Sequence, residues 1–333
     1  MKTSLTDLYG ELRPEDVPPS GIAETRIAVA RHTGVNPDEV VITAGACLGL
    51  NCVMTLGRVR GWNRVVLCPR PHFPAYSSVA LLQGFALSYY DLRPDQGWTP
   101  DLDALEKTIL VEKPGLVLWN LPHNPTGAVF EREATDRVLA AAHAAGSVVV
   151  MDEVFADLVF DGEQPQAPYL SNHLYRLGGF NKRFPSLCDD RVAYVLAPAS
   201  AAADIALIHR TIAVGAAVVS QRAAGTLLEG DTASQLSQLR SELRRNRDYA
   251  VERLRNCPAI SVEAPRAGLF IWFRLPDGTD TRRFSTDLRE RTGLWCAGGH
   301  SFGYSAEPWA RLRFALPMET LRHHCDAVEG FLR

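Results

Sequence analysis

The sequence predicts an α/β fold with a mostly parallel sheet sandwiched by helices, followed by a smaller α+β C-terminal part. Between about residues 37 and 200, short β-rich runs alternate with longer helical stretches. These short runs are almost continuously apolar, as expected for strands that are covered on both faces. After about residue 200, the pattern changes to long helical segments with a few short strands. Together, these observations predict a large α/β domain and a smaller α+β domain.

The same alternation assigns the individual elements. Strands of the first part are expected at 39–43, 64–68, 116–119, 147–151 and 192–196, with helices between them, for example at 46–56 and 131–145. The second part is expected to contain helices at 201–228 and 281–291, a long, charged and exposed helix at 232–255, strands at 260–262, 268–275 and 310–316, and a closing helix from residue 318. The predicted large domain is 22–225, and the small domain is 226–333 together with 1–21.

The composition argues against several classes of protein. The chain has 333 residues, which is enough for two domains, and 46% of them are hydrophobic. Nucleic acid is not an expected partner, because the net charge is −3 and no long basic run is present. The apolar runs are shorter than the roughly 20 residues of a membrane helix, and the first residues do not resemble a signal peptide. We therefore expect a cytoplasmic protein without a membrane partner.

Cysteine usage gives a further expectation about the compartment. The 7 cysteines are scattered and form no Cys-x-x-Cys pair. An odd number without such pairs argues against a disulfide framework and against a structural zinc site. We expect mostly buried, reduced thiols and no metal.

Three motifs place chemically useful residues just beyond expected strands. The segment 121–127 contains two prolines and a glycine, which predict a rigid turn. Asp152 ends a strand, where a buried carboxylate needs a partner. Lys182 closes the segment 178–182 after another probable strand, and Arg191 lies 9 positions further on. In open α/β sheets, ligands bind at the carboxyl edge of the strands, so these residues are candidates for one site.

Each motif also has an ordinary explanation. The segment 121–127 can be a connecting loop, Asp152 can be a helix cap, and Lys182 can be an exposed loop lysine. A buried lysine, in contrast, loses its charge readily and can form a Schiff base. Taken one at a time, the motifs leave both explanations open.

Their order along the chain resembles a known family. The Asn-Pro-Thr-Gly turn at 124–127, the strand that ends in Asp152-Glu153 and the strand-edge Lys182 are similar to the fold type I pyridoxal-phosphate (PLP) enzymes. The similarity is specifically to the class I/II, aspartate-aminotransferase-like aminotransferases, from about Gly21 to the C-terminus. It implies PLP as the cofactor, an amino-acid substrate, a homodimer and the PLP transferase fold.

The resemblance implies roles at the cofactor. Lys182 would hold PLP as a Schiff base and later move the Cα proton of the substrate. Asp152 would pair with the pyridine nitrogen, and the protonated ring would act as an electron sink. Asn124 would hydrogen-bond the phenolic oxygen, and Phe73 would stack on the ring. The phosphate would be held at a helix start, with an arginine, by Gly45, Ala46, Cys47 and Arg191.

The resemblance also implies residues that contact the substrate. Arg311 matches the arginine that binds the α-carboxylate, and Arg313 is a competing candidate two positions on. By analogy, a second group would line the side-chain pocket, although each member can equally be an ordinary loop or core residue: His72, Tyr76, His300 and Phe302. The leading hypothesis is a PLP-dependent aminotransferase that acts on an L-amino acid.

The sequence departs from the family pattern at several positions. The expected tyrosine that donates to the phenolic oxygen is Phe155, and the expected serines before the lysine are Gly179 and Asn181. Asp189 and Asp190 would repel a phosphate unless they are turned away.

The segment before Gly21 is also short, and Tyr9 is the tyrosine nearest to the position where the family has one. These departures keep open a specialised enzyme of the same fold that catalyses elimination, replacement, cyclisation or carbon–carbon bond formation in secondary metabolism. A non-catalytic PLP-binding protein is the third hypothesis.

Overall fold

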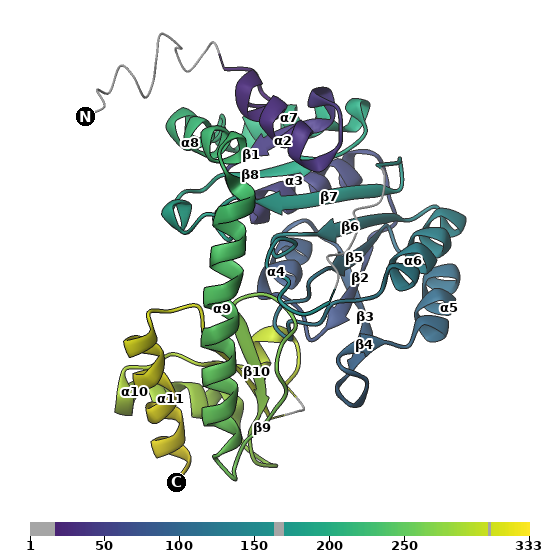
Figure 1. Cartoon of the computed structure of the whole chain (residues 1–333). Coiled ribbons are helices and arrows are strands. Elements are labelled where there is room, and N and C mark those ends of the chain that lie inside the picture. Colours follow the sequence, from purple (N-terminus) through teal and green to yellow (C-terminus); the bar gives the residue numbers. More distant parts are fainter. Residues whose placement is uncertain (1–16, 163–169, 306–307) are drawn as a thin grey trace, which may run out of the picture.

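A sheet of eight strands forms the centre of the computed structural model, which describes residues 17–162, 170–305 and 308–333 (Figure 1). The strand order is β1-β8-β7-β6-β5-β2-β3-β4. The strands are β1 (Val40–Thr43), β2 (Val65–Arg70), β3 (Ala86–Arg93), β4 (Thr99–Pro100), β5 (Leu116–Asn120), β6 (Val148–Asp152), β7 (Leu174–Gly179) and β8 (Ala193–Leu196). Neighbours from β7 to β3 are parallel, whereas β8 pairs antiparallel with β7 and β1, and β4 with β3. The predicted mostly parallel sheet is confirmed.

Helices cover both faces of this sheet. They are α2 (Ala23–Thr33), α3 (Ala46–Val59), α4 (Pro74–Leu82), α5 (Leu102–Glu112), α6 (Arg132–Ala145), α7 (Ala199–Ala213) and α8 (Val218–Glu229). On β5, Val117 and Trp119 share a core cluster with residues of α5 and α6, whereas Leu116 and Leu118 share one with residues of α3, α4 and α7. Successive side chains of a strand point to opposite faces, so a strand covered on both sides must be apolar throughout.

The helix expected at 201–228 is instead two helices. α7 ends at Ala213, and α8 begins at Val218. Between them, Val214 has a φ of 62°, a left-handed conformation that is rare for a β-branched residue. The segment is apolar and contains no proline, and Gly215, two residues after the end of α7, is the one local signal that could have marked the break. The two helices pack on different neighbours, α7 against α3 and β1 and α8 against α2, and this packing requires the chain to turn between them.

The rest of the chain packs around a second, antiparallel sheet in the order β11-β12-β10-β9. Its elements are α9 (Thr232–Arg255), β9 (Ser261–Val262), β10 (Phe270–Arg274), α10 (Thr281–Thr292), β11 (Ala297–Gly298), β12 (Trp309–Arg313) and α11 (Met318–Leu332). Figure 1 shows α9 running from the neighbourhood of α8 along this small sheet. One face of α9 is buried there, with Leu243, Ala250 and Leu254 in the core, so the expectation of an exposed helix holds only for its other face.

Other sequence-based expectations can be compared with the described residues. The predicted division after residue 225 falls inside α8, and it stays a prediction. In the described part of the chain, no helix is long and apolar enough to cross a membrane. The described residues also contain no group of three or more His, Cys, Asp or Glu side chains placed to hold a metal ion. All seven cysteines are free, and five of them are buried.

Candidate active site

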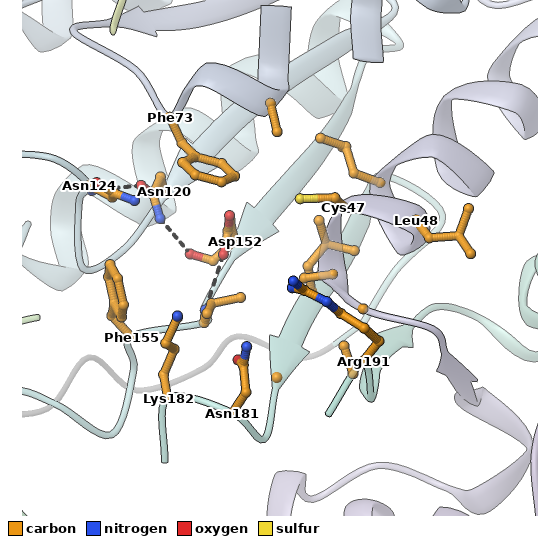
Figure 2. A pocket seen from close by; sticks show the side chains of 18 of the residues that line it. Cys47, Leu48, Phe73, Asn120, Asn124, Asp152, Phe155, Asn181, Lys182 and Arg191 are labelled. Atoms are coloured by element: carbon orange, nitrogen blue, oxygen red, sulfur yellow. Dashed lines mark hydrogen bonds between the residues drawn. The ribbon is translucent and has the colours of Figure 1, made fainter. Parts of the chain in front are cut away.

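A cavity of about 560 Å³ lies where three parallel strands end (Figure 2). Asn120 ends β5, Asp152 ends β6 and Gly179 ends β7, and all three residues line the cavity. Parallel strands place their carboxyl ends at the same edge of a sheet, so residues distant in sequence meet there. Nine of the predicted site residues line it as well: Gly45, Ala46, Cys47, Phe73, Tyr76, Asn124, Lys182, Arg191 and Arg311.

Asp152 presents a carboxylate at the floor of the cavity. Its Oδ2 accepts a hydrogen bond from the Tyr76 hydroxyl at 2.6 Å, and its Oδ1 accepts one from the Val154 N–H at 3.1 Å. Burial raises the pKa of Asp152, while these two hydrogen bonds lower it. Both donors are neutral, so they leave the negative charge uncompensated. A cationic group in the cavity would stabilise the ionised carboxylate.

Lys182 lies across the cavity, on the turn that follows β7. Figure 2 shows its amine directed into the cavity, on the side of Asp152 and Phe155. Burial lowers the pKa of Lys182, and the positive charges of Arg313, Arg191 and Arg311 lower it further. A lysine with a lowered pKa has a larger neutral fraction, and the neutral amine is the nucleophilic and proton-accepting form.

One end of the cavity is suited to an anionic group. Gly45, with a φ of 98°, precedes α3, and the start of this helix has no side-chain cap. The free N–H groups and the helix dipole favour an anion there. Figure 2 shows Arg191 at the same end of the cavity, near Cys47. Asp190 also lines the cavity, and its Oδ1 accepts a hydrogen bond from the Ser220 hydroxyl of α8.

The opposite part of the cavity carries Arg311 of β12. Its NH1 donates to Asn124 Oδ1 at 2.9 Å, and its guanidinium lies 3.8 Å from the centre of the Phe270 ring. Burial lowers the pKa of Arg311 to about 10, so the group remains a cation near neutral pH. Arg313 is exposed and does not line the cavity; its Nε donates to the Ala315 carbonyl at 3.0 Å. The geometry therefore favours Arg311 over Arg313 as an anchor for a carboxylate.

Three residues expected in the side-chain pocket have other contacts. The Tyr76 hydroxyl donates to Asp152, so its role is to hold that carboxylate. His72 is buried outside the cavity lining, stacked on Tyr76 and Tyr89 at ring distances of 6.4 and 6.0 Å. His300 is also outside the lining, with its Nδ1 3.1 Å from the Thr281 hydroxyl. Tyr76 lines the cavity as expected, whereas the expectation for His72 and His300 is corrected, because analogy places a residue in a loop but does not determine where its side chain points.

Sequence reasoning missed some residues of the cavity. Asn120 accepts the Asn124 N–H through its Oδ1 at 2.7 Å and donates through Nδ2 to the Asp152 carbonyl at 3.0 Å. It thereby connects the loop after β5 to the end of β6. Its position directly after the expected strand 116–119 was a usable signal. The aromatic ring of Phe270 carried no such signal, because an apolar residue in a strand is usually part of a core.

Cys47 provides a chemical test of the site. Cys47 is accessible to solvent and lines the cavity, where partial desolvation of its thiol and the charge of Asp152 raise its pKa. We expect a maleimide to label Cys47 slowly, and phosphate-bearing PLP to slow the labelling by roughly tenfold at about ten times its Kd. Cys188 is exposed but does not line the cavity, so its labelling should stay unchanged. Peptide mass spectrometry measures both rates, and equal protection of the two thiols would contradict the assignment.

Comparison with known proteins gives the family. The sequence model described as aminotransferase class I and II matches residues 14–328. The LL-diaminopimelate aminotransferase of Dehalococcoides mccartyi is 29% identical over 89% of this chain and 76% of its own length. The arginine–pyruvate transaminase of Pseudomonas aeruginosa is 28% identical over 96% of this chain and 81% of its own.

A solved structure agrees with this result. The aspartate aminotransferase of Thermotoga maritima superposes with a TM-score of 0.83 at 26% identity, over 95% of this chain and 83% of the other. The fold class and the PLP cofactor implied by the resemblance are thus confirmed, as is an enzyme of the aminotransferase type. The chain belongs to the class I and II family of PLP-dependent aminotransferases.

Proposed function

We propose that this chain transfers the amino group of an L-amino acid to a keto acid in the cavity at the ends of β5, β6 and β7. The observation that carries the proposal is the convergence of Lys182, Asp152 and Arg311 on that cavity. These residues come from three different parts of the chain and offer an amine, a carboxylate and a guanidinium, which are the groups that amino-group transfer needs.

The residues present fit PLP. The uncompensated carboxylate of Asp152 suits a protonated pyridine nitrogen, and the uncapped start of α3 with Arg191 suits the phosphate. Phe73 offers a flat apolar face to the ring, and Asn124 offers an amide that lines the same cavity. When bound, PLP supplies an electron sink that stabilises negative charge at the substrate Cα.

Each residue of the cavity would then have a separate role in binding the substrate or in proton transfer. Arg311 would bind the α-carboxylate of the substrate in a bidentate way and orient the amino acid. Asn124, which accepts from Arg311, would keep that guanidinium in place. Lys182 Nζ would take the proton from the substrate Cα and deliver it to the C4′ position. Asp152 would keep a positive charge on the pyridine nitrogen throughout.

The half-reaction tests this proposal. The PLP-loaded protein is mixed with single L-amino acids, and the absorbance of the cofactor is followed. We expect at least one amino acid to convert PLP to the pyridoxamine form with release of a keto acid, and a keto acid to reverse the change. A stable spectral change without a pyridoxamine form or a keto acid would reject transamination in favour of the specialised elimination, replacement or cyclisation chemistry.

Arg311 should determine the affinity for the substrate. We expect Arg311→Gln to raise the KM for the amino acid by roughly 10- to 100-fold, because a hydrogen bond to a charged group is lost. PLP affinity should change little. Arg313→Gln is the matched control, since Arg313 is exposed and outside the cavity. Steady-state kinetics of both variants decide the assignment, and a larger effect at Arg313 would reverse it.

Phe155 should influence how the bound cofactor titrates. A tyrosine at this position could donate to the phenolic oxygen of the cofactor, which would then attract the neighbouring proton less strongly. We therefore expect Phe155→Tyr to lower the pKa seen in the absorption spectrum of the bound cofactor, and the natural Phe155 to keep it higher. A pH titration of both proteins measures the difference. An unchanged or raised pKa in the tyrosine variant would exclude this effect.

A homodimer in the cytoplasm completes the proposal. The homodimer is what the family resemblance implies for this chain, the cytoplasmic location rests on the composition and the first residues, and the amino acid is the small-molecule partner. The mass of the native protein in solution tests the dimer directly.

A further inference from the structure

Lys182 is carried by a turn whose two ends are anchored in the core. The Phe184 N–H donates to the Phe180 carbonyl at 2.8 Å and closes the turn around residues 181–183. The side chains of Phe180 and Phe184 are buried and belong to the core cluster that contains β1 and β8 residues. The backbone on both sides of Lys182 is therefore held, but these contacts do not connect the turn to Asp152.

Arg183 makes that connection. Its Nε donates to Asp157 Oδ2 at 2.7 Å, and its NH2 donates to the same oxygen. The side chains of Arg183 and Asp157 are only 5% and 18% exposed. Neither charge can easily return to water once the pair is broken, so the contact is costly to lose and holds its geometry firmly.

Asp157 lies on the segment that follows β6. Asp152 ends β6, and Phe155 lines the cavity from the same segment. The Asp157 carbonyl also accepts from Arg240 of α9 at 2.6 Å. The ion pair thus ties the turn with the amine to the segment with the carboxylate, and that segment is in turn fixed to α9.

We propose that Arg183 is a positioning residue for Lys182: its ion pair with Asp157 sets the distance between the Lys182 turn and the segment that carries Asp152 and Phe155. Arg183 is not among the residues that line the cavity, so it acts through the backbone of the turn. A long lysine side chain gains reactivity when its base is held within a narrow range of positions. The inference rests on the proposed role of Lys182.

Two forms of the cofactor separate positioning from general stability. PLP can be joined covalently to Lys182, whereas pyridoxamine phosphate cannot and reports only on the rest of the cavity. For Arg183→Gln, we expect the rate of PLP incorporation into the apoenzyme to fall on the order of tenfold to a hundredfold. The Kd of pyridoxamine phosphate should stay within about twofold of wild type. Arg183→Lys keeps the charge and should recover part of the rate of PLP incorporation. If Arg183→Gln does not fold, Arg183→Lys is measured in its place.

Arg247→Gln is the matched control. Arg247 of α9 is equally buried, at 6% exposed, and its partners are Asp161 of the same segment as Asp157, Asp248 and the Pro265 carbonyl, none of which belongs to the Lys182 turn. We expect Arg247→Gln to lose thermal stability as Arg183→Gln does. Its rate of PLP incorporation and its Kd for pyridoxamine phosphate should keep the same relation to each other as in wild type. Asp157→Asn should reproduce the Arg183→Gln defect, and the double variant should be no worse than either single one, because both changes break one contact.

The possible results separate this inference from the proposed function. Equal loss of PLP and pyridoxamine phosphate in Arg183→Gln, or the same PLP-specific loss in Arg247→Gln, would show that Arg183 is merely structural. Borohydride reduction of the wild-type protein with PLP, followed by peptide mapping, identifies the linked residue. A label on Lys182 together with normal PLP kinetics in the Arg183 variants would overturn the positioning role alone. A label on another residue would overturn both this role and the proposed function.

Discussion

Replacing Lys182 with alanine is expected to remove transamination almost completely. Among the described residues that line the cavity, Lys182 supplies the one primary amine. Burial and three arginines lower its pKa, which favours the neutral form that accepts a proton. Loss of a general acid–base group costs roughly 10²- to 10⁴-fold in rate. Single-turnover conversion of PLP to pyridoxamine phosphate by an accepted amino acid measures the loss.

The control variant Lys182→Arg distinguishes charge from proton transfer. A guanidinium keeps the positive charge but does not give up its proton in proteins, so this variant should be as slow as the alanine variant. A small primary amine added to Lys182→Ala should restore part of the rate, because it can carry the proton in the space left by the side chain. A wild-type rate in Lys182→Ala would refute the assignment of the base.

The second large effect is expected at Asp152. The isosteric change Asp152→Asn removes the negative charge while it preserves the size of the side chain. We expect kcat to fall by roughly 10²- to 10³-fold, because an electrostatic contact that stabilises the transition state is lost. Rapid-mixing measurements with the PLP-loaded variant report the rate, and the cofactor content shows whether binding is preserved.

Tyr76→Phe tests the same carboxylate with a smaller change, because it removes only a hydrogen bond to Asp152. The Tyr76 hydroxyl lowers the pKa of Asp152, so its removal should raise that pKa. The ionised carboxylate is needed, and the acid limb of the kcat profile should therefore move to higher pH while the rate at alkaline pH changes little. If Asp152→Asn were as active as wild type, the electron-sink role would have to be given up. An acid limb that moves to lower pH would reject the role of Tyr76.

The sequence was a good guide wherever a residue's position follows from the strand that precedes it. Asp152 and Lys182 were predicted at strand ends, and the structure places both at the same cavity. The roles of these residues stay predictions that the experiments above address. Tyr76 and His72 show where this guidance fails. Both lie near the start of α4, yet one reaches Asp152, 76 positions away in the chain, and the other packs against Tyr89.

Local sequence patterns could not predict the contacts between segments that are distant in the chain. The Arg183–Asp157 pair joins residues 26 positions apart, and the Arg311–Asn124 hydrogen bond joins residues 187 positions apart. A charged side chain in a loop has the same sequence signature whether it points to solvent or to a buried partner. The break between α7 and α8 was missed although Gly215 lies two residues after the end of α7, because a single glycine in an apolar segment is also compatible with one continuous helix.

By itself, the sequence determined the α/β class, the order of the main elements and the residues that belong to the family's cofactor motifs. The class and the element order depend on the period of apolar residues and on the turn chemistry of short segments, which are local, whereas the motif residues were recognised through the family resemblance. Only the tertiary structure decided that Arg311 rather than Arg313 enters the cavity, that Tyr76 serves Asp152, and that Arg183 ties the Lys182 turn to its neighbour. Those outcomes depend on which strand ends meet at one edge of the sheet and on which buried charges find partners, and both are set by packing between distant parts of the chain.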